Sequence, residues 1–167
     1  MSKKLISLAL AALMAFSLVA CGNSADKNKE DENPAFSADL AQFYSTLFQG
    51  ADAPAMDEVT DDMLEYLYPG LAEIELNQRV IYAPMISAVA AEVALVEVAN
   101  AEDVETVKAI FQQRIDDQVA GGAWYPATIE VWEQNSEIVV IDNYVCLFVG
   151  TDKDAQVEAF RALGQAE

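Results

Sequence analysis

The residues best suited to ligand chemistry are an arginine and a glutamine one helical turn apart, together with a glutamate that begins an apolar segment. Arg114 and Gln118 are spaced i, i+4, which places both side chains on one face of a helix. Glu92 begins the apolar segment 91–99, which predicts a central strand. Two interpretations stay open: a polar pocket in which Arg114 recognises a carboxylate, and an internal salt bridge from Arg114 to Glu92 or Asp117. The salt bridge is favoured, because a partly buried arginine usually pairs within its own chain.

Three aromatic residues form a second candidate site. Trp124, Tyr125 and Trp132 follow Gly121 and Gly122, which would let a loop present them to solvent. As an exposed platform they would bind a glycan or a peptide. The alternative is a core plug at the end of a helix, and the apolar character of the side chains favours it.

Other chemistries find little support in the composition. The chain has no histidine, so no Ser or Cys triad can be assembled. Adjacent acidic pairs such as Asp116 and Asp117 lack the spacing of a calcium loop, and we expect no metal and no cofactor. Cys146 lies in an apolar run and is interpreted as a buried structural residue. A pair of carboxylates for glycoside hydrolysis cannot be chosen from 28 acidic residues.

Charge narrows the class of partner. With 9 Lys and Arg residues against 28 Asp and Glu residues, the formal net charge is −19. Nucleic-acid binding needs a stripe of basic side chains that neutralises phosphates, and no such stripe is present in the sequence. We therefore expect no nucleic-acid partner and interpret the acidity as a source of solubility.

The N-terminal residues predict export and lipidation. Lys3 and Lys4 precede an apolar run, residues 5–20, which ends in the letters LVAC at Cys21. This pattern resembles the box cut by lipoprotein signal peptidase, and the run is too short for a transmembrane anchor. The expectation is a signal peptide over residues 1–20, a lipid on Cys21, and a protein anchored on the extracytoplasmic face of the cell membrane.

A polar segment follows the predicted lipidation site. Residues 22–34 read GNSADKNKEDENP and contain too little apolar surface to fold. Residues 21–35 are therefore predicted to be a lipidated Cys and a flexible tether of about 20 Å root-mean-square length. A single α+β domain is predicted over residues 36–167.

Helical and strand periodicities define the elements of that domain. Helices are predicted over 40–48 with a Ser37 cap, over 61–67 after Thr60, over a long segment from Asn100 to the glycines at 121–122, and over 153–163. Strands are predicted over 79–82, 91–99, 137–141 and 144–149, with Asp142 and Asn143 as the turn of the second hairpin. Residues 127–134 fit either a helix or a strand. These elements indicate an α+β fold with a small antiparallel four-stranded sheet, made of two hairpins and packed with three to five helices on one face.

Several short segments resemble a known family. They are Tyr82 to Met85, Ala91 with Glu92, Arg114 with Gln118, Tyr125 with Pro126, and Asn143 to Val145. Together they make residues 40–160 similar to the small bacterial lipoproteins defined as domain of unknown function 4358. The resemblance implies an anchored extracytoplasmic protein with no assigned activity and no catalytic residues. One departure is that Asp142 and Asn143 stand where a glycine often follows the first hairpin strand.

The function that these features indicate is binding rather than catalysis. We expect a membrane-anchored, non-enzymatic domain that binds a protein, peptide or glycan at the cell surface. Trp124, Tyr125, Arg114, Gln118 and Glu92 are the candidate ligand-binding residues. The alternative is a carboxylate-based hydrolase that acts on cell-wall material.

Overall fold

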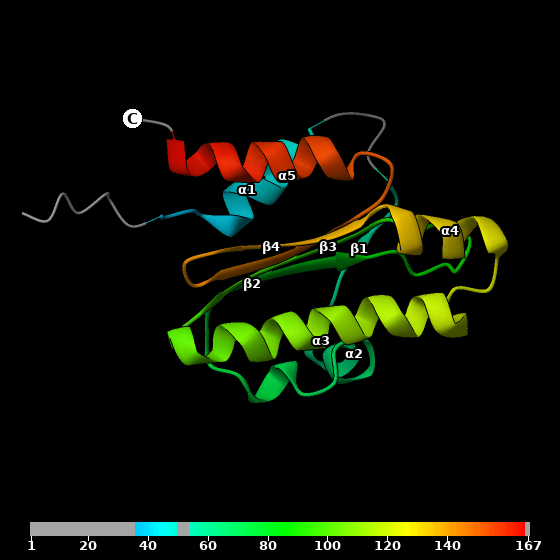
Figure 1. Cartoon of the computed structure of the whole chain (residues 1–167), viewed down its shortest axis with the longest axis horizontal. Coiled ribbons are helices and arrows are strands. Elements are labelled where there is room, and N and C mark those ends of the chain that lie inside the picture. Colours follow the sequence, from blue (N-terminus) through cyan, green and yellow to red (C-terminus); the bar gives the residue numbers. More distant parts are fainter. Residues whose placement is uncertain (1–35, 50–53, 166–167) are drawn as a thin grey trace, which may run out of the picture. The chain divides into compact units, whose positions relative to one another are not determined.

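A five-stranded antiparallel sheet organises the protein. The computed structural model describes residues 36–49 and 54–165, and Figure 1 shows their arrangement. The strands are β1 (Asp57–Glu58), β2 (Leu76–Ala83), β3 (Glu92–Val98), β4 (Ser136–Ile141) and β5 (Tyr144–Val149). Their order across the sheet is β1-β2-β3-β5-β4, and every neighbouring pair is antiparallel. The predicted α+β class and both predicted strand pairings are confirmed.

The prediction of four strands was wrong, because a short fifth strand lies on the edge of the sheet. In β1, Asp57 pairs with Ala83 and Glu58 pairs with Tyr82. Both β1 side chains are exposed, so no alternation of apolar and polar residues marks this strand in the sequence. It forms because the outer edge of β2 offers free backbone groups.

Five α-helices flank the sheet. They are α1 (Leu40–Leu47), α2 (Asp61–Leu67), α3 (Val104–Asp117), α4 (Pro126–Gln134) and α5 (Lys153–Ala162). The segment left open between helix and strand is α4, which has Pro126 at its first turn, where the missing N–H costs nothing. The predicted caps differ: the Asp39 side chain accepts from the Gln42 N–H at 2.9 Å in place of Ser37. Thr60 precedes α2, and Asn100 precedes a 3₁₀ turn, Ala101–Asp103, each without a side-chain cap bond.

Helices cover both faces of the sheet, not one as predicted. In Figure 1, α1 and α5 lie on one face and α2 and α3 on the other. The cause is that β3 and β5 are buried on both faces. Successive residues of a strand point to opposite faces, and in β5 the neighbours Leu147 and Phe148 belong to different apolar clusters. Phe111 of α3 packs in the first cluster and Phe160 of α5 in the second.

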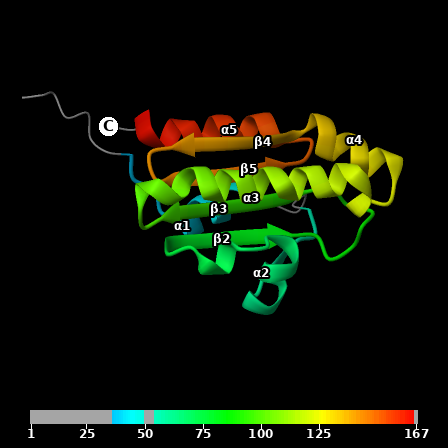
Figure 2. The same ribbon diagram turned by 60° about the horizontal axis from the view of Figure 1, so that its bottom comes forward.

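The two ends of the sheet carry different features. The β4–β5 turn at Asp142 and Asn143 is confirmed, with Ile141 paired to Tyr144 and Asp142 at a positive φ of 49°. Figure 2 shows this hairpin turn at one end of the sheet, while α4 and the β2–β3 connection lie at the other. The candidate site lies at the α4 end.

Candidate functional site

A buried ion pair joins the sheet to α3. Glu92, the first residue of β3, is fully buried and lies on the face that α3 covers. Arg114, in the last turn of α3, donates from Nε to Glu92 Oε1 at 2.9 Å and from Nη2 to Oε2 at 2.7 Å. The Tyr68 hydroxyl donates to the same Oε1. The structure therefore contains the salt bridge to Glu92 that the sequence favoured, in the bidentate form that suits a guanidinium and a carboxylate.

The Glu92 carboxylate keeps Arg114 charged, and two aromatic rings pack against the guanidinium. The guanidinium carbon of Arg114 is 5.2 Å from the centre of the Trp132 ring and 5.9 Å from that of Tyr68. Burial opposes the charged form of Arg114, but the hydrogen bonds and the charge of Glu92 outweigh it and raise the pKa of the guanidinium. Burial, followed by the charge of Glu92, raises the pKa of Tyr68 well above its usual value. Arg114 stays charged and Tyr68 stays a hydrogen-bond donor.

One edge of the guanidinium remains available. Within the described part of the chain, Nη1 of Arg114 donates to no protein acceptor. Nor is this nitrogen sealed inside the protein, because Gln156 Oε1 is the one fully buried side-chain polar atom without a partner among residues 36–49 and 54–165. The Arg114 side chain keeps 12% of its surface accessible. A guanidinium has a fixed fork geometry, so the Nη1 edge can donate to a second acceptor while Glu92 occupies the Nε edge.

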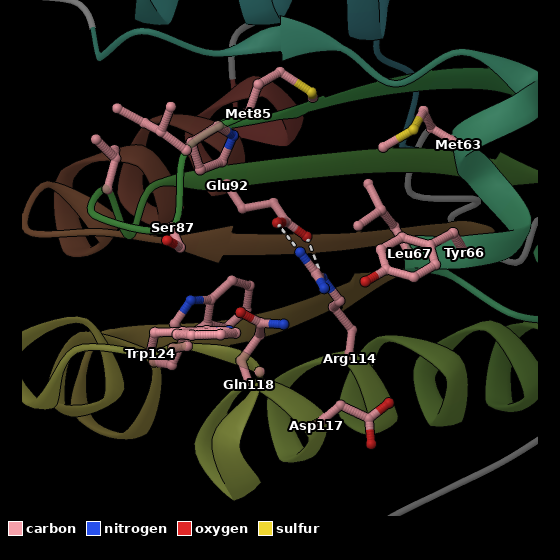
Figure 3. Close-up of a pocket in the computed structure, with 16 residues that line it drawn as sticks. Met63, Tyr66, Leu67, Met85, Ser87, Glu92, Arg114, Asp117, Gln118 and Trp124 are labelled. Carbon is pink, nitrogen blue, oxygen red and sulfur yellow. Dashed lines mark hydrogen bonds and ion pairs between the residues drawn. The ribbon is translucent and has the colours of Figure 1, made fainter.

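A pocket of about 520 Å³ lies over this ion pair. Figure 3 shows the Glu92–Arg114 pair with Tyr66 of α2 on one side and Trp124 on the other. This volume falls in the range of small-molecule sites. The walls come from α2, the β2–β3 connection, the end of α3 and α4: Met63, Tyr66, Leu67, Pro84, Met85, Ile86, Ser87, Val89, Asp117, Gln118, Gly122, Ala123, Trp124 and Trp132.

The rim of the pocket is apolar and unusually exposed. The side chains concerned are Tyr66 at 80% exposure, Met85 at 48%, Ile86 at 59% and Trp124 at 81%. Large apolar groups gathered around one concave site on a protein surface mark interaction sites, whereas isolated ones carry no such meaning.

A π-helical turn at the end of α3 shapes one wall of the pocket. It spans Gln118–Gly122, and the Ala123 N–H donates to the Gln118 carbonyl at 3.1 Å across it. Gly121 adopts a φ of 133°, which glycine alone adopts without strain. A Cβ on Gly122 would lie 2.5 Å from Gln118 Nε2, so this glycine makes room for the Gln118 amide. Such turns are frequent at functional sites.

The structure brings together four of the five predicted ligand-binding residues. Glu92, Arg114, Gln118 and Trp124 line the pocket, whereas Tyr125 is 54% exposed and lies outside the lining. Trp132 is buried beneath Arg114 instead of joining an exposed platform with Trp124 and Tyr125.

Sequence reasoning missed Tyr68 and Tyr66 as well as Met85 and Ile86, the exposed apolar residues of the β2–β3 connection. Tyr68 stands at a helix end beside Pro69, where periodicity no longer tells which way a side chain points. Met85 closes one of the segments that carried the family resemblance, and that was the available signal for the connection.

The comparison with known families decides the affiliation of the chain. The sequence model of the family described as "Domain of unknown function (DUF4358)" matches residues 49–150, more than half of the 167 residues. The chain belongs to this family. The segment of this chain that matches the DUF4358 model contains all five strands and every residue that lines the pocket, while α1 and α5 lie outside it. No curated protein and no solved structure matches the chain significantly.

Other predicted features can be placed only in part. Cys146 is buried in β5, and burial raises the pKa of its thiol, as a structural cysteine requires. The described residues contain no group of three or more Cys, Asp or Glu side chains placed to hold a metal ion. In the same part of the chain, every helix is too short or too polar to cross a bilayer. Cys21, the signal peptide 1–20 and the tether 21–35 lie outside the described residues.

Proposed function

We propose that this member of the DUF4358 family is a lipid-anchored, extracytoplasmic binding protein whose pocket over Arg114 holds a ligand without altering it chemically. The observation that carries the proposal is the open donor edge of Arg114 at the floor of a pocket with an exposed apolar rim. Convergent polar groups inside an apolar pocket are the usual form of a ligand site.

The way the chain enters the domain fits an anchor at Cys21. Phe36 donates its backbone N–H to Asp142 Oδ2 at 3.0 Å, and its ring packs on Tyr144 with a centroid distance of 5.0 Å. These contacts hold the start of the domain at the hairpin end of the sheet. Glu92, by contrast, pairs with Val149 at the far end of β5. Along this strand, Val149 lies about 17 Å from Tyr144, at roughly 3.4 Å per residue. The start of the domain and the pocket thus lie at opposite ends of the sheet.

The alternative, a carboxylate-based hydrolase, finds less support. Glu92 and Asp117 are the two carboxylates that line the pocket. Both oxygens of Glu92 accept hydrogen bonds from Arg114, and Tyr68 adds a third, so this group is not free to move a proton. A pair of free carboxylates, as glycoside hydrolysis requires, is missing from the lining.

Hydrogen exchange tests the proposed binding function. The full chain is incubated with isolated cell-envelope material, and backbone amide exchange is compared with that of the chain alone. We expect slower exchange in the segments that line the pocket, residues 63–67, 84–89 and 118–124, because a bound ligand excludes water there. The protection should disappear in Trp124→Ala and persist in the matched control Tyr125→Ala, which alters an exposed neighbour outside the lining. Unchanged exchange in these segments with every envelope fraction would contradict the proposal.

A further inference from the structure

Part of the pocket wall forms an apolar cup beside the polar floor. Met63 and Leu67 of α2, Met85 of the β2–β3 connection and Trp124 form its apolar walls. Methionine side chains adapt their shape to an apolar guest, and Trp, Tyr, Met and Arg are the residues enriched at protein interfaces. Saccharides use aromatic faces and many polar partners, so exposed Met85 and Ile86 would contribute little to a glycan. An apolar side chain of a partner fits this cup better.

The floor of the cup can hold a neutral acceptor. Glu92 already neutralises Arg114, and Asp117 adds a further negative charge to the lining, so a carboxylate ligand would be repelled. A backbone carbonyl carries no charge and accepts directly from an N–H donor. The Nη1 edge of Arg114 and the amide of Gln118 are thus suited to the main chain beside an inserted side chain.

Charge around the pocket selects the flanks of such a segment. Glu92 and Asp117 are the acidic residues of the lining, and Arg114, its one basic residue, is paired with Glu92, so Asp117 leaves the lining with a net negative charge. Asp62 and Glu65 are exposed on α2, the helix that also supplies Tyr66 to the lining. Together with the net charge of −19, they favour a partner with positive charge next to its apolar anchor.

We propose that the pocket binds a segment of a partner protein in which an apolar anchor side chain is flanked by lysines or arginines. The anchor fills the cup, its backbone carbonyl accepts from Nη1 of Arg114, and the basic flanks lie against Asp117 and the exposed acidic residues of α2. This inference rests on the proposed binding function and names the ligand class of the same site.

A peptide titration tests it directly. The probe is a pool of blocked hexapeptides with two lysines at each end and two residues from Leu, Ile, Val and Phe at the centre, added to the detergent-solubilised full chain. Because the pool contains no tryptophan, covering Trp124 should shift the protein's own emission to the blue. We expect saturable binding that weakens more than ~10-fold in Trp124→Ala, as for a central interface residue, and is unchanged in Tyr125→Ala. Binding should also weaken as salt is raised.

Two further peptide pools and one saccharide provide the outcomes that would overturn the inference. Equal binding of a pool with glutamates in place of the lysines would remove the role of charge, and equal binding of lysine peptides with an Ala-Ala centre would remove the role of the anchor. Binding of an N-acetylglucosamine tetramer in place of the basic pool would replace the peptide with a glycan. Failure of the basic pool to bind, while envelope material still protects the pocket from exchange, overturns this inference and leaves the proposed function standing.

Discussion

At the residue scale, the site depends on a charge that the fold has buried. Glu92 is an acidic residue at the start of a strand that is otherwise apolar, and every oxygen it has is engaged by Arg114 or Tyr68. Such a pair contributes little net stability over an apolar pair of similar size, but a buried charge that loses its partner is costly. The main effect of the ion pair is therefore to fix the position of the Arg114 side chain beneath the pocket.

A double-mutant cycle measures this coupling. Arg114→Leu leaves the buried Glu92 carboxylate without its cation, and we expect the free energy of unfolding to fall by about 3–5 kcal/mol. The double variant Glu92→Leu with Arg114→Leu should recover most of that loss, because no charge is then stranded. Urea denaturation of the wild type, Arg114→Leu, Glu92→Leu and the double variant gives the coupling energy, and a double variant as unstable as Arg114→Leu would show that the pair is not the cause.

Sequence reasoning reached this pair but not its surroundings. An arginine on the helix and a glutamate at the start of the central strand were enough to predict an internal salt bridge of Arg114, but the sequence left Glu92 and Asp117 open as its partner, and the structure has Glu92. The burial of Trp132 and the exposure of Trp124 could not be assigned, because both depend on how the chain turns between α3 and α4. The sequence gives no reason to expect different burial for the two tryptophans, whereas the backbone between α3 and α4 leaves Trp124 exposed and buries Trp132.

At the element scale, strong periodicity made elements predictable and weak periodicity hid them. α5 and the β4–β5 hairpin carry clear apolar patterns and were predicted close to their observed bounds, whereas α2 was predicted from its end signals, Thr60 before it and Pro69 after it. β1 carries no pattern, since its two acidic residues are exposed and its pairing is decided by β2. The covering of both sheet faces was implied by the apolar residues of both parities in β3 and β5, but the pairing of helices with faces required the tertiary structure.

The π-helical turn is the element on which the pocket wall depends most. In Gly122→Ala the new Cβ would lie 2.5 Å from Gln118 Nε2 and 2.9 Å from the Asp117 carbonyl oxygen. The Gln118 side chain can swing away, but the carbonyl is fixed by the helix, so the turn must shift. We expect a loss of about 1–3 kcal/mol in unfolding free energy, typical of overpacking, measured by urea denaturation. The same substitution in a Gln118→Ala background should cost nearly as much, and an unchanged stability for Gly122→Ala would contradict this account of the turn.

At the scale of the whole molecule, the pocket and Phe36, at the start of the domain, are separated by the length of the sheet. The N-terminal end of the domain is held by Asp142 and Tyr144, and the Phe36 ring also packs against Phe160 of α5 at 5.3 Å. The helices α1 and α5, which lie outside the family match, form the apolar cluster on this side. The contacts at the start of the domain are therefore separate from the residues that line the pocket.

The proposal that the protein is anchored at the end opposite the pocket depends on the prediction that Cys21 is lipidated. Cells that express the full chain are grown with a labelled fatty acid, and we expect label on the wild-type protein and none on Cys21→Ala, because the thiol of Cys21 is the predicted attachment point. Cys146→Ala is the matched control and should label normally, since that thiol is buried in β5 and burial raises its pKa. Label that persists in Cys21→Ala would contradict the proposed anchor at Cys21. The position of the pocket, at the end of the sheet farthest from Phe36, would then have no connection with membrane attachment.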